Sequence, residues 1–175
     1  AAALCPGSCG TVSISSDNRC ILALAAACGG LLRQAVVWHS IAVRQVNNTG
    51  LRMKIDTTMV LDNPADAGEL ARRLEVIGYD GIYSFEGQHD PFLPLAVASQ
   101  TTSRAQLGTG IAVAFARNPM SIAYQANDLQ LLTRGRFILG LGTQIQAHIE
   151  KRFSAEWSHP AARMRDMVKA IQAIF

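Results

Sequence analysis

The sequence predicts an α/β protein built on a parallel sheet, and two observations support this prediction. Short apolar segments typical of strands begin near residues 54, 81, 105 and 136, so they recur at roughly the thirty-residue pitch of strand-helix units. Helical periodicity fills the intervals between them. The first strand-to-helix turn lacks G-x-G-x-x-G, which disfavours a Rossmann domain. Periodicity leaves a doubly wound sheet and half of an eight-stranded barrel open.

Each expected strand is a short apolar run bounded by turn residues. The four runs cover residues 54–61, 81–85, 105–114 and 137–141. Glycines in the third and fourth runs indicate places where the backbone bends or lets another group approach closely. In a half-barrel we expect one isoleucine of each strand to face inward, namely Ile55, Ile82, Ile111 and Ile138.

The helices are predicted from their first and last residues. Asn63-Pro64 and Asn118-Pro119 each combine a capping side chain with a first-turn proline, and Gly78 is a typical helix end. Pro160 begins the last expected helix. The polar residues 143–150 follow the fourth strand and are predicted to form a loop at the carboxyl-terminal edge of the sheet, where parallel sheets build their sites.

Composition excludes some classes of function. The chain has 175 residues, of which 49% are hydrophobic, and it contains no low-complexity tract. Residues 1–52 hold four Arg and one Asp, so their net charge is +3, whereas residues 53–175 hold twelve basic and twelve acidic residues. The basic balance therefore comes entirely from the first segment, and no basic face with interleaved aromatics predicts nucleic-acid binding.

The first 52 residues differ from the rest in character. Their apolar run, 21–32, is too short to span a bilayer. All four cysteines of the chain lie in this segment, but they form no C-x-x-C pair. We expect residues 1–52 to be a poorly structured extension, or upstream sequence ahead of a natural start at Met53.

Three segments together resemble the luciferase-like monooxygenase superfamily, and most closely its coenzyme F420-dependent oxidoreductases. They are GYDGIYSFEGQHDPF (78–92), LGTGIAVAFARNP (107–119) and GRFILGLGTQIQAHIEKRFSAEWSHPAAR (135–163). The resemblance covers residues 53–175 and not residues 1–52. It implies a TIM (β/α)₈ barrel, of which this chain would contain the amino-terminal half with the first four βα units. The chain is therefore expected to be a truncated fragment.

The resemblance also implies a set of site residues. Gly110-Ile111 occupies the place of a strand bulge with a non-proline cis peptide that backs the flavin-like ring, and glycine suits close approach of a ring. Glu86 and His89 match catalytic positions, and Gln144 and His148 match cofactor-binding positions. From the residues alone, plainer roles stay open: strand curvature for Gly110, and capping or solvation for the others.

The implied activity is hydride transfer between coenzyme F420 and a small organic substrate. An FMN-dependent monooxygenase on the same barrel is the alternative enzyme, and a non-catalytic barrel fragment or scaffold subunit is the alternative outside catalysis. The fragment alone is expected to be inactive. We expect a small-molecule substrate, no nucleic-acid or membrane partner, no metal, a homodimer of the full-length parent, and a cytoplasmic location. Arg117, before a helix start, is expected to meet an anion or a nearby acid.

Overall fold

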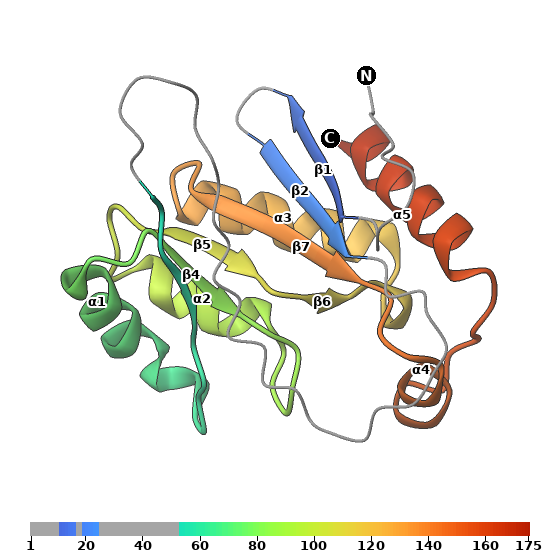
Figure 1. Ribbon diagram of the computed structural model, residues 1–175, viewed down its shortest axis with the longest axis horizontal. Helices are drawn as coiled ribbons and strands as arrows, with labels where there is room; N and C mark the ends of the chain where they lie inside the picture. The colour runs from blue at the N-terminus through green and yellow to red at the C-terminus, as the bar shows by residue number, and fades with distance from the viewer. Residues whose placement is uncertain (1–10, 17–18, 25–52) are drawn as a thin grey trace.

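The computed structural model describes residues 11–16, 19–24 and 53–175, and its centre is a twisted sheet (Figure 1). The predicted strands pair in chain order, with β3 beside β4, β4 beside β5, and β5 beside β7, and every one of these pairs is parallel. The prediction of an α/β fold with a parallel sheet is therefore confirmed. The bounds are β3 (Asp56–Thr58), β4 (Gly81–Ser84), β5 (Gln106–Thr109), β6 (Ala112–Val113) and β7 (Phe137–Gly142).

The predicted helices begin where the sequence places them, but the elements differ from the prediction at two points. Asn63 and Asn118 accept backbone N–H bonds from Ala65 and Ser121, as helix caps do, and Gly78 ends α1 with a φ of 118°. The first difference is a short helix, α4, inside residues 143–150, which were predicted as a loop. The elements are η1 (Pro64–Asp66), α1 (Ala67–Ile77), α2 (Phe92–Ser99), η2 (Ala114–Ala116), α3 (Pro119–Leu132), α4 (Gln146–Arg152) and α5 (Pro160–Ile174).

The second difference is a break in the third strand. Residues 105–114 were predicted as one strand, but β5 ends at Thr109 and the chain moves sideways, so that β6 pairs with the far half of β7. The break coincides with Gly110, where the family resemblance implies a bulge.

Two further strands lie inside the segment for which little structure was expected. β1 (Thr11–Ser16) and β2 (Arg19–Leu24) form an antiparallel pair, and β2 runs parallel to β7 (Figure 1). These twelve residues therefore depart from the expectation. The rest of residues 1–52, including Cys5, Cys9 and Cys28, lies outside the described residues, and a domain boundary at residue 53 stays a prediction.

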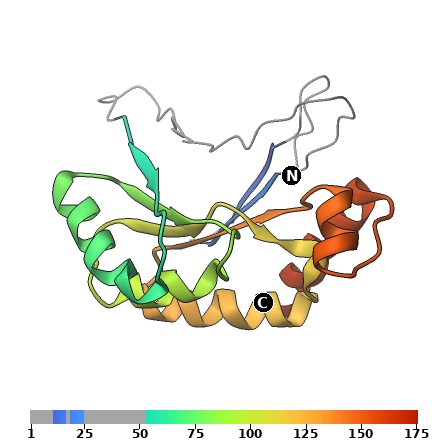
Figure 2. The ribbon, with the colours of Figure 1, turned by 90° about the horizontal axis from the view of Figure 1, so that it is seen from below.

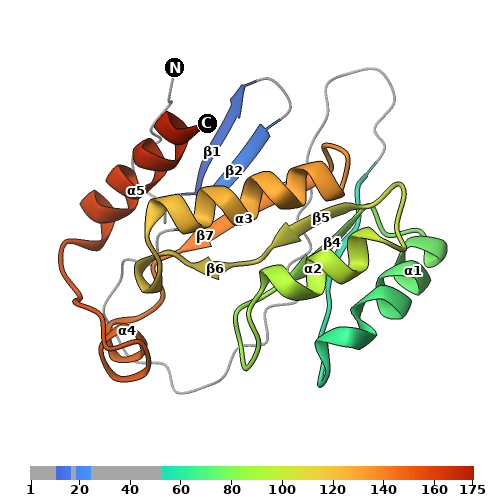
Figure 3. The ribbon, with the colours of Figure 1, turned by 180° about the vertical axis from the view of Figure 1, so that it is seen from behind.

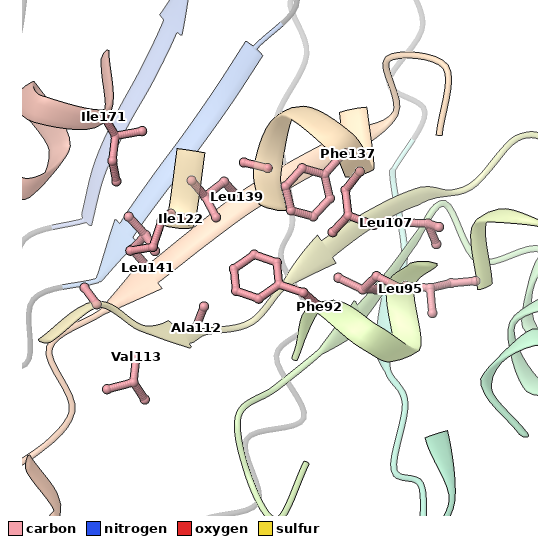
Figure 4. Close-up of a cluster of buried hydrophobic side chains, with 14 of the residues drawn as sticks. Phe92, Leu95, Leu107, Ala112, Val113, Ile122, Phe137, Leu139, Leu141 and Ile171 are labelled. Carbon is pink, nitrogen blue, oxygen red and sulfur yellow. The ribbon is translucent and has the colours of Figure 1, made fainter. Parts of the chain in front are cut away.

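The core lies between the sheet and the helices on one of its faces (Figures 2 and 3). Figure 4 shows strand residues such as Leu107 and Leu139 close to Leu95 of α2 and Ile122 of α3. Burying these side chains supplies the main driving force for folding. None of the described helices is both long enough and apolar enough to cross a membrane.

Ile82 corrects the prediction of inward-facing isoleucines. It is fully buried and pairs in register with Leu107, so it shares the helix-covered face of the sheet. Strand alternation then directs its neighbour Tyr83 to the opposite face. The Tyr83 ring lies over Gly108, where an added Cβ would stand 2.5 Å from Tyr83 Cε1. The second face is therefore built of glycine backbone covered by an aromatic ring.

Candidate functional site

The break after β5 creates the central feature of the carboxyl-terminal edge. The peptide between Gly110 and Ile111 is cis, as the resemblance implies. Two backbone bonds tie this segment to the end of β4: the Gly110 N–H donates to the Ser84 carbonyl at 2.7 Å, and the Glu86 N–H donates to the Ile111 carbonyl at 3.1 Å. Gly110 is exposed and Ile111 is half-buried, so this backbone is open to a ligand.

Thr109 and Gly140 show how the sheet tolerates the break. The Thr109 hydroxyl donates to the Gly140 carbonyl at 2.7 Å and accepts from the Gly140 N–H at 2.8 Å, which replaces the missing ladder bonds. A Cβ on Gly140 would stand 2.0 Å from the Thr109 carbonyl oxygen. Glycine is required at position 140 because the two backbones come this close.

A cluster of one arginine and two acids lies beside this segment. Arg117 Nη1 is 2.5 Å from Glu86 Oε2 and Arg117 Nη2 is 2.9 Å from Asp90 Oδ2. The side chains of Arg117 and Glu86 are only 14% and 7% exposed. We call these three residues the Arg117 cluster. Of the two partners expected for Arg117, the structure shows the nearby acid.

The surroundings of the Arg117 cluster favour its charged state. Burial alone lowers the pKa of Arg117, but hydrogen bonds and charges from Glu86 and Asp90 outweigh it, so the pKa lies above its ordinary value. The Phe92 ring covers the guanidinium, with its centroid 5.6 Å from Cζ. Asp90 Oδ1 also accepts from the Phe92 N–H at 2.8 Å, at the start of α2.

His89 shares a loop with Glu86 but points to a different place. Its Nε2 is 3.1 Å from the Asp62 carbonyl oxygen, in the loop after β3. A cavity of about 100 Å³ lies between these two loops. Its lining is mostly apolar, with His89 among the few polar groups, and includes Met59, Leu61, Ser84, Phe85 and Pro94. The structure therefore separates the two predicted catalytic residues: Glu86 faces the break in β5 and His89 faces this cavity.

The two predicted cofactor-binding residues follow β7. Gln144 is half-buried with a positive φ of 61°, and its side-chain oxygen accepts from the Ile145 N–H at 3.1 Å. Because Val113 pairs with Gly142, Gln144 lies two residues past the strand pair that flanks the cis peptide. His148 is exposed on α4. Gln144 thus lies at the same edge as Gly110, whereas His148 is one helical turn further away.

Sequence reasoning missed two contacts at this edge. Asp90 was not proposed as a partner of Arg117, although two acids four residues apart in one loop are a usable signal. Arg152 of α4 donates to the Gly87 carbonyl and so links α4 to the loop after β4. Two aromatic side chains pack within the protein: Trp157 meets Phe115 edge-on, with ring centroids 5.8 Å apart, and Phe153 packs on the core.

Within residues 53–175 and the two described strands before them, no three His, Cys, Asp or Glu side chains come together as a metal site would require.

Residues 39–175 match the luciferase-like monooxygenase family. The chain belongs to this family. The match begins fourteen residues before Met53, so the expectation that the resemblance leaves out all of residues 1–52 is wrong for residues 39–52.

Curated relatives of this chain include proteins of mycobacteria. The chain is 55% identical over 124 residues to the uncharacterized protein Rv1360 of Mycobacterium tuberculosis, an alignment that covers 71% of this chain and 36% of that protein. It is 31% identical over 113 residues to "Putative coenzyme F420-dependent oxidoreductase Rv3520c" of the same organism, covering 64% of this chain and 33% of that protein. The chain thus spans about a third of the length of these relatives.

Two solved structures with the same fold are described with different cofactors. The coenzyme F420-dependent tetrahydromethanopterin reductase of Methanopyrus kandleri superposes with a TM-score of 0.57 at 22% identity, covering 67% of this chain and 38% of that one. The oxygenating constituent of 3,6-diketocamphane monooxygenase of Pseudomonas putida, in complex with FMN, gives 0.56 at 16% identity, covering 62% and 34%. These likenesses establish the luciferase-like fold for the described chain.

Proposed function

We propose that this chain is the amino-terminal part of a coenzyme F420-dependent oxidoreductase, with its first four βα units belonging to a (β/α)₈ barrel. The enzyme transfers a hydride between the coenzyme and a small organic substrate. The observation that carries the proposal is the exposed Gly110-Ile111 backbone at the carboxyl-terminal edge, where barrel enzymes build their sites. The F420-dependent relative and fold neighbour support this choice of cofactor.

The residues at this edge fit a flat ring system with little charge. Gly110 has no side chain to block a ring, and Ile111 beside it offers half-buried apolar surface. Phe85 is 42% exposed, so a large apolar side chain at the same end of β4 remains uncovered. Glu86 and Arg117 meanwhile satisfy each other and direct no free charge outward. We therefore assign Gly110 and Ile111 to ring binding, and we keep Gln144 and His148 as the proposed cofactor-binding residues after β7.

A bound deazaflavin supplies the hydride chemistry at one ring carbon, so the protein has to orient the ring and exclude water. We place the substrate toward the mostly apolar cavity beside His89, whose ring can hold or pass a proton there. We propose His89 as the catalytic residue; Glu86, the second residue that the resemblance assigns to catalysis, does not line the cavity.

An FMN-dependent monooxygenase is the second candidate, because a fold neighbour was solved with FMN bound. Separate titrations of the purified chain with F420 and with FMN, followed by ring absorbance, discriminate between the two. We expect F420 to bind at least about tenfold more tightly, a difference of about 1.4 kcal/mol. Tighter binding of FMN would overturn the choice of cofactor.

A glycine variant tests the location of the ring. Gly110→Ala should weaken F420 binding at least about tenfold, because the new methyl group stands where the ring must approach. Gly68→Ala is the matched control: an added Cβ at either glycine lies 3.3 Å from the nearest side-chain carbon, but Gly68 is in α1. Equal affinities of Gly110→Ala and the wild type would contradict the proposed ring position.

A further inference from the structure

We infer that Arg117 is the positioning residue of this site, and that Glu86 acts with it by holding the Gly110–Val113 segment instead of transferring protons. The inference rests on the proposed function only in taking this edge as the surface that meets the cofactor. The contacts that carry it are internal to the chain and can be tested without any ligand.

The first step is the geometry of the contacts around Val113. One carboxylate oxygen, Glu86 Oε2, accepts both from the Val113 N–H at 2.7 Å and from Arg117 Nη1 at 2.5 Å. The same Nη1 donates to the Val113 carbonyl at 3.0 Å. Glu86, Val113 and Arg117 thus form a closed cycle of hydrogen bonds that binds both the N–H and the carbonyl of Val113. Val113 is two residues after Ile111, which belongs to the proposed ring-binding surface.

Glu86 holds the Gly110–Val113 segment through both its side chain and its backbone. While its carboxylate binds Val113, its backbone N–H donates to the Ile111 carbonyl at 3.1 Å. Ile111 and Val113 are therefore both hydrogen-bonded to Glu86, which follows β4. Oε2 accepts two hydrogen bonds, so both of its lone pairs are directed at the protein.

The Arg117 cluster is also buried, and its charges are compensated. The guanidinium spans the break and the start of α2, because Nη2 reaches Asp90, whose other oxygen accepts the Phe92 N–H. Two carboxylates more than balance one cation, and the positive end of α2 offsets the excess. An enclosed and balanced charge of this kind fixes geometry, since removing one partner leaves the other buried and unpaired.

A second arginine-glutamate pair provides the contrast. Arg72 binds Glu69 through two hydrogen bonds of 2.8 and 3.0 Å, but the side chains are 52% and 62% exposed. Both residues lie on α1, three positions apart, so this pair connects nothing beyond its own helix. Exposed pairs of this type contribute little to structure. Arg72→Ala is therefore the matched control for Arg117→Ala.

The experiment measures amide hydrogen exchange by NMR in the full 175-residue chain. In Arg117→Ala, the amides of Glu86, Gly110 and Val113 should exchange at least about tenfold faster than in the wild type, because their segment opens locally. The amides of Leu107 and Phe137, in the neighbouring strands, should keep their rates. Arg72→Ala should change none of these rates.

A milder variant covers the case in which Arg117→Ala does not fold. Glu86→Gln keeps an acceptor for Val113 but removes the charge that binds Arg117, and it should give the same local pattern with a smaller increase. Uniform acceleration of all amides in the folded variant would mean a purely structural role, and no acceleration would mean no role. Either result overturns the inference.

The cofactor supplies a separate readout. Arg117→Ala should weaken F420 binding at least about tenfold, while Arg117→Lys, which keeps the charge but not the two-pronged geometry, should fall between it and the wild type. If the wild type does not bind F420, the proposed function fails and the exchange pattern still decides the inference. If F420 binds equally well to Arg117→Ala, the inference fails and the proposed function stands.

Discussion

The two ends of the sheet both carry charged groups, but they use them differently. At the amino-terminal end, the Glu75 carboxylate accepts from the backbone N–H groups of Ser103, Arg104 and Ala105 at 3.1, 2.7 and 2.6 Å. Arg136 donates to the Ala105 carbonyl at 2.5 Å. These contacts tie the turn before β5 to its neighbours. At the carboxyl-terminal end, the Arg117 cluster holds a broken strand.

The backbone, and not the apolar surface, distinguishes the two ends. Exposed apolar side chains and a non-glycine residue with positive φ occur at both: Val76 at 76% and Arg134 close in sequence to Glu75 and Arg136, and Phe85 at 42% and Gln144 after β4 and β7. Neither these features nor satisfied charges alone therefore mark a site in this fold. The carboxyl-terminal end differs in the break after β5, which leaves the Gly110 backbone exposed at the edge where parallel sheets build their sites.

Two glycines, one from each end, give the largest expected difference in stability. Gly140→Ala should lower the free energy of unfolding by about 3 kcal/mol, because its Cβ would stand 2.0 Å from the Thr109 carbonyl and force β5 and β7 apart. Gly78→Ala should cost about 1 kcal/mol, since only its φ of 118° is unfavourable and the space around it is open. Urea denaturation measures both. Equal costs would show that close approach at the break does not distinguish the two ends.

A smaller effect is expected from the charge at the amino-terminal end, and it depends on pH. Burial alone raises the pKa of Glu75, but the backbone N–H bonds and Arg104 outweigh it, so the pKa lies below its ordinary value. A lowered pKa means that the ionised carboxylate stabilises the folded chain above its unfolded pKa, and that this contribution is lost as the pH falls through the folded pKa. Glu75→Gln should therefore cost about 1 kcal/mol at pH 7.

The same variant should lose this difference in acid. The unfolding free energies of Glu75→Gln and the wild type should converge as the pH falls below about 4.3, the ordinary value for glutamate. The control is Asp66→Asn, which removes the charge of an acid in the first turn after Asn63. A difference for Glu75→Gln that stays constant down to pH 3 would show that its ionisation is not coupled to folding.

Much of the fold could be predicted from local sequence signals. Asn63-Pro64, Asn118-Pro119 and Gly78 determine helix ends through their own side chains or backbone freedom, so no knowledge of distant residues is needed. The parallel sheet followed from the spacing of the strands. The face of the sheet on which Ile82 lies could not be predicted in the same way. Helices cover one face of β4, and Tyr83 packs over glycine on the other, so apolar and polar residues do not alternate clearly along the strand.

The site was only partly predictable for the same reason. Gly110-Ile111 could be located because the family resemblance specifies both the position and the cis peptide. The link between Glu86 and Arg117 joins residues 31 positions apart, and its geometry depends on the break in β5. Helix α4 was missed because it has only seven residues, most of them polar, and so shows no clear apolar face.

We propose that the cofactor surface lies at the carboxyl-terminal end of the sheet and not at the amino-terminal end. The most direct test is a ¹H–¹⁵N NMR titration of the chain with F420, which reports weak binding residue by residue. We predict that the amide signals of Gly110, Ile111 and Gln144 shift as F420 is added, while those of Ser103 and Ala105 stay in place. Shifts centred on Ser103 and Ala105, or no shifts at any concentration of F420, would contradict the account.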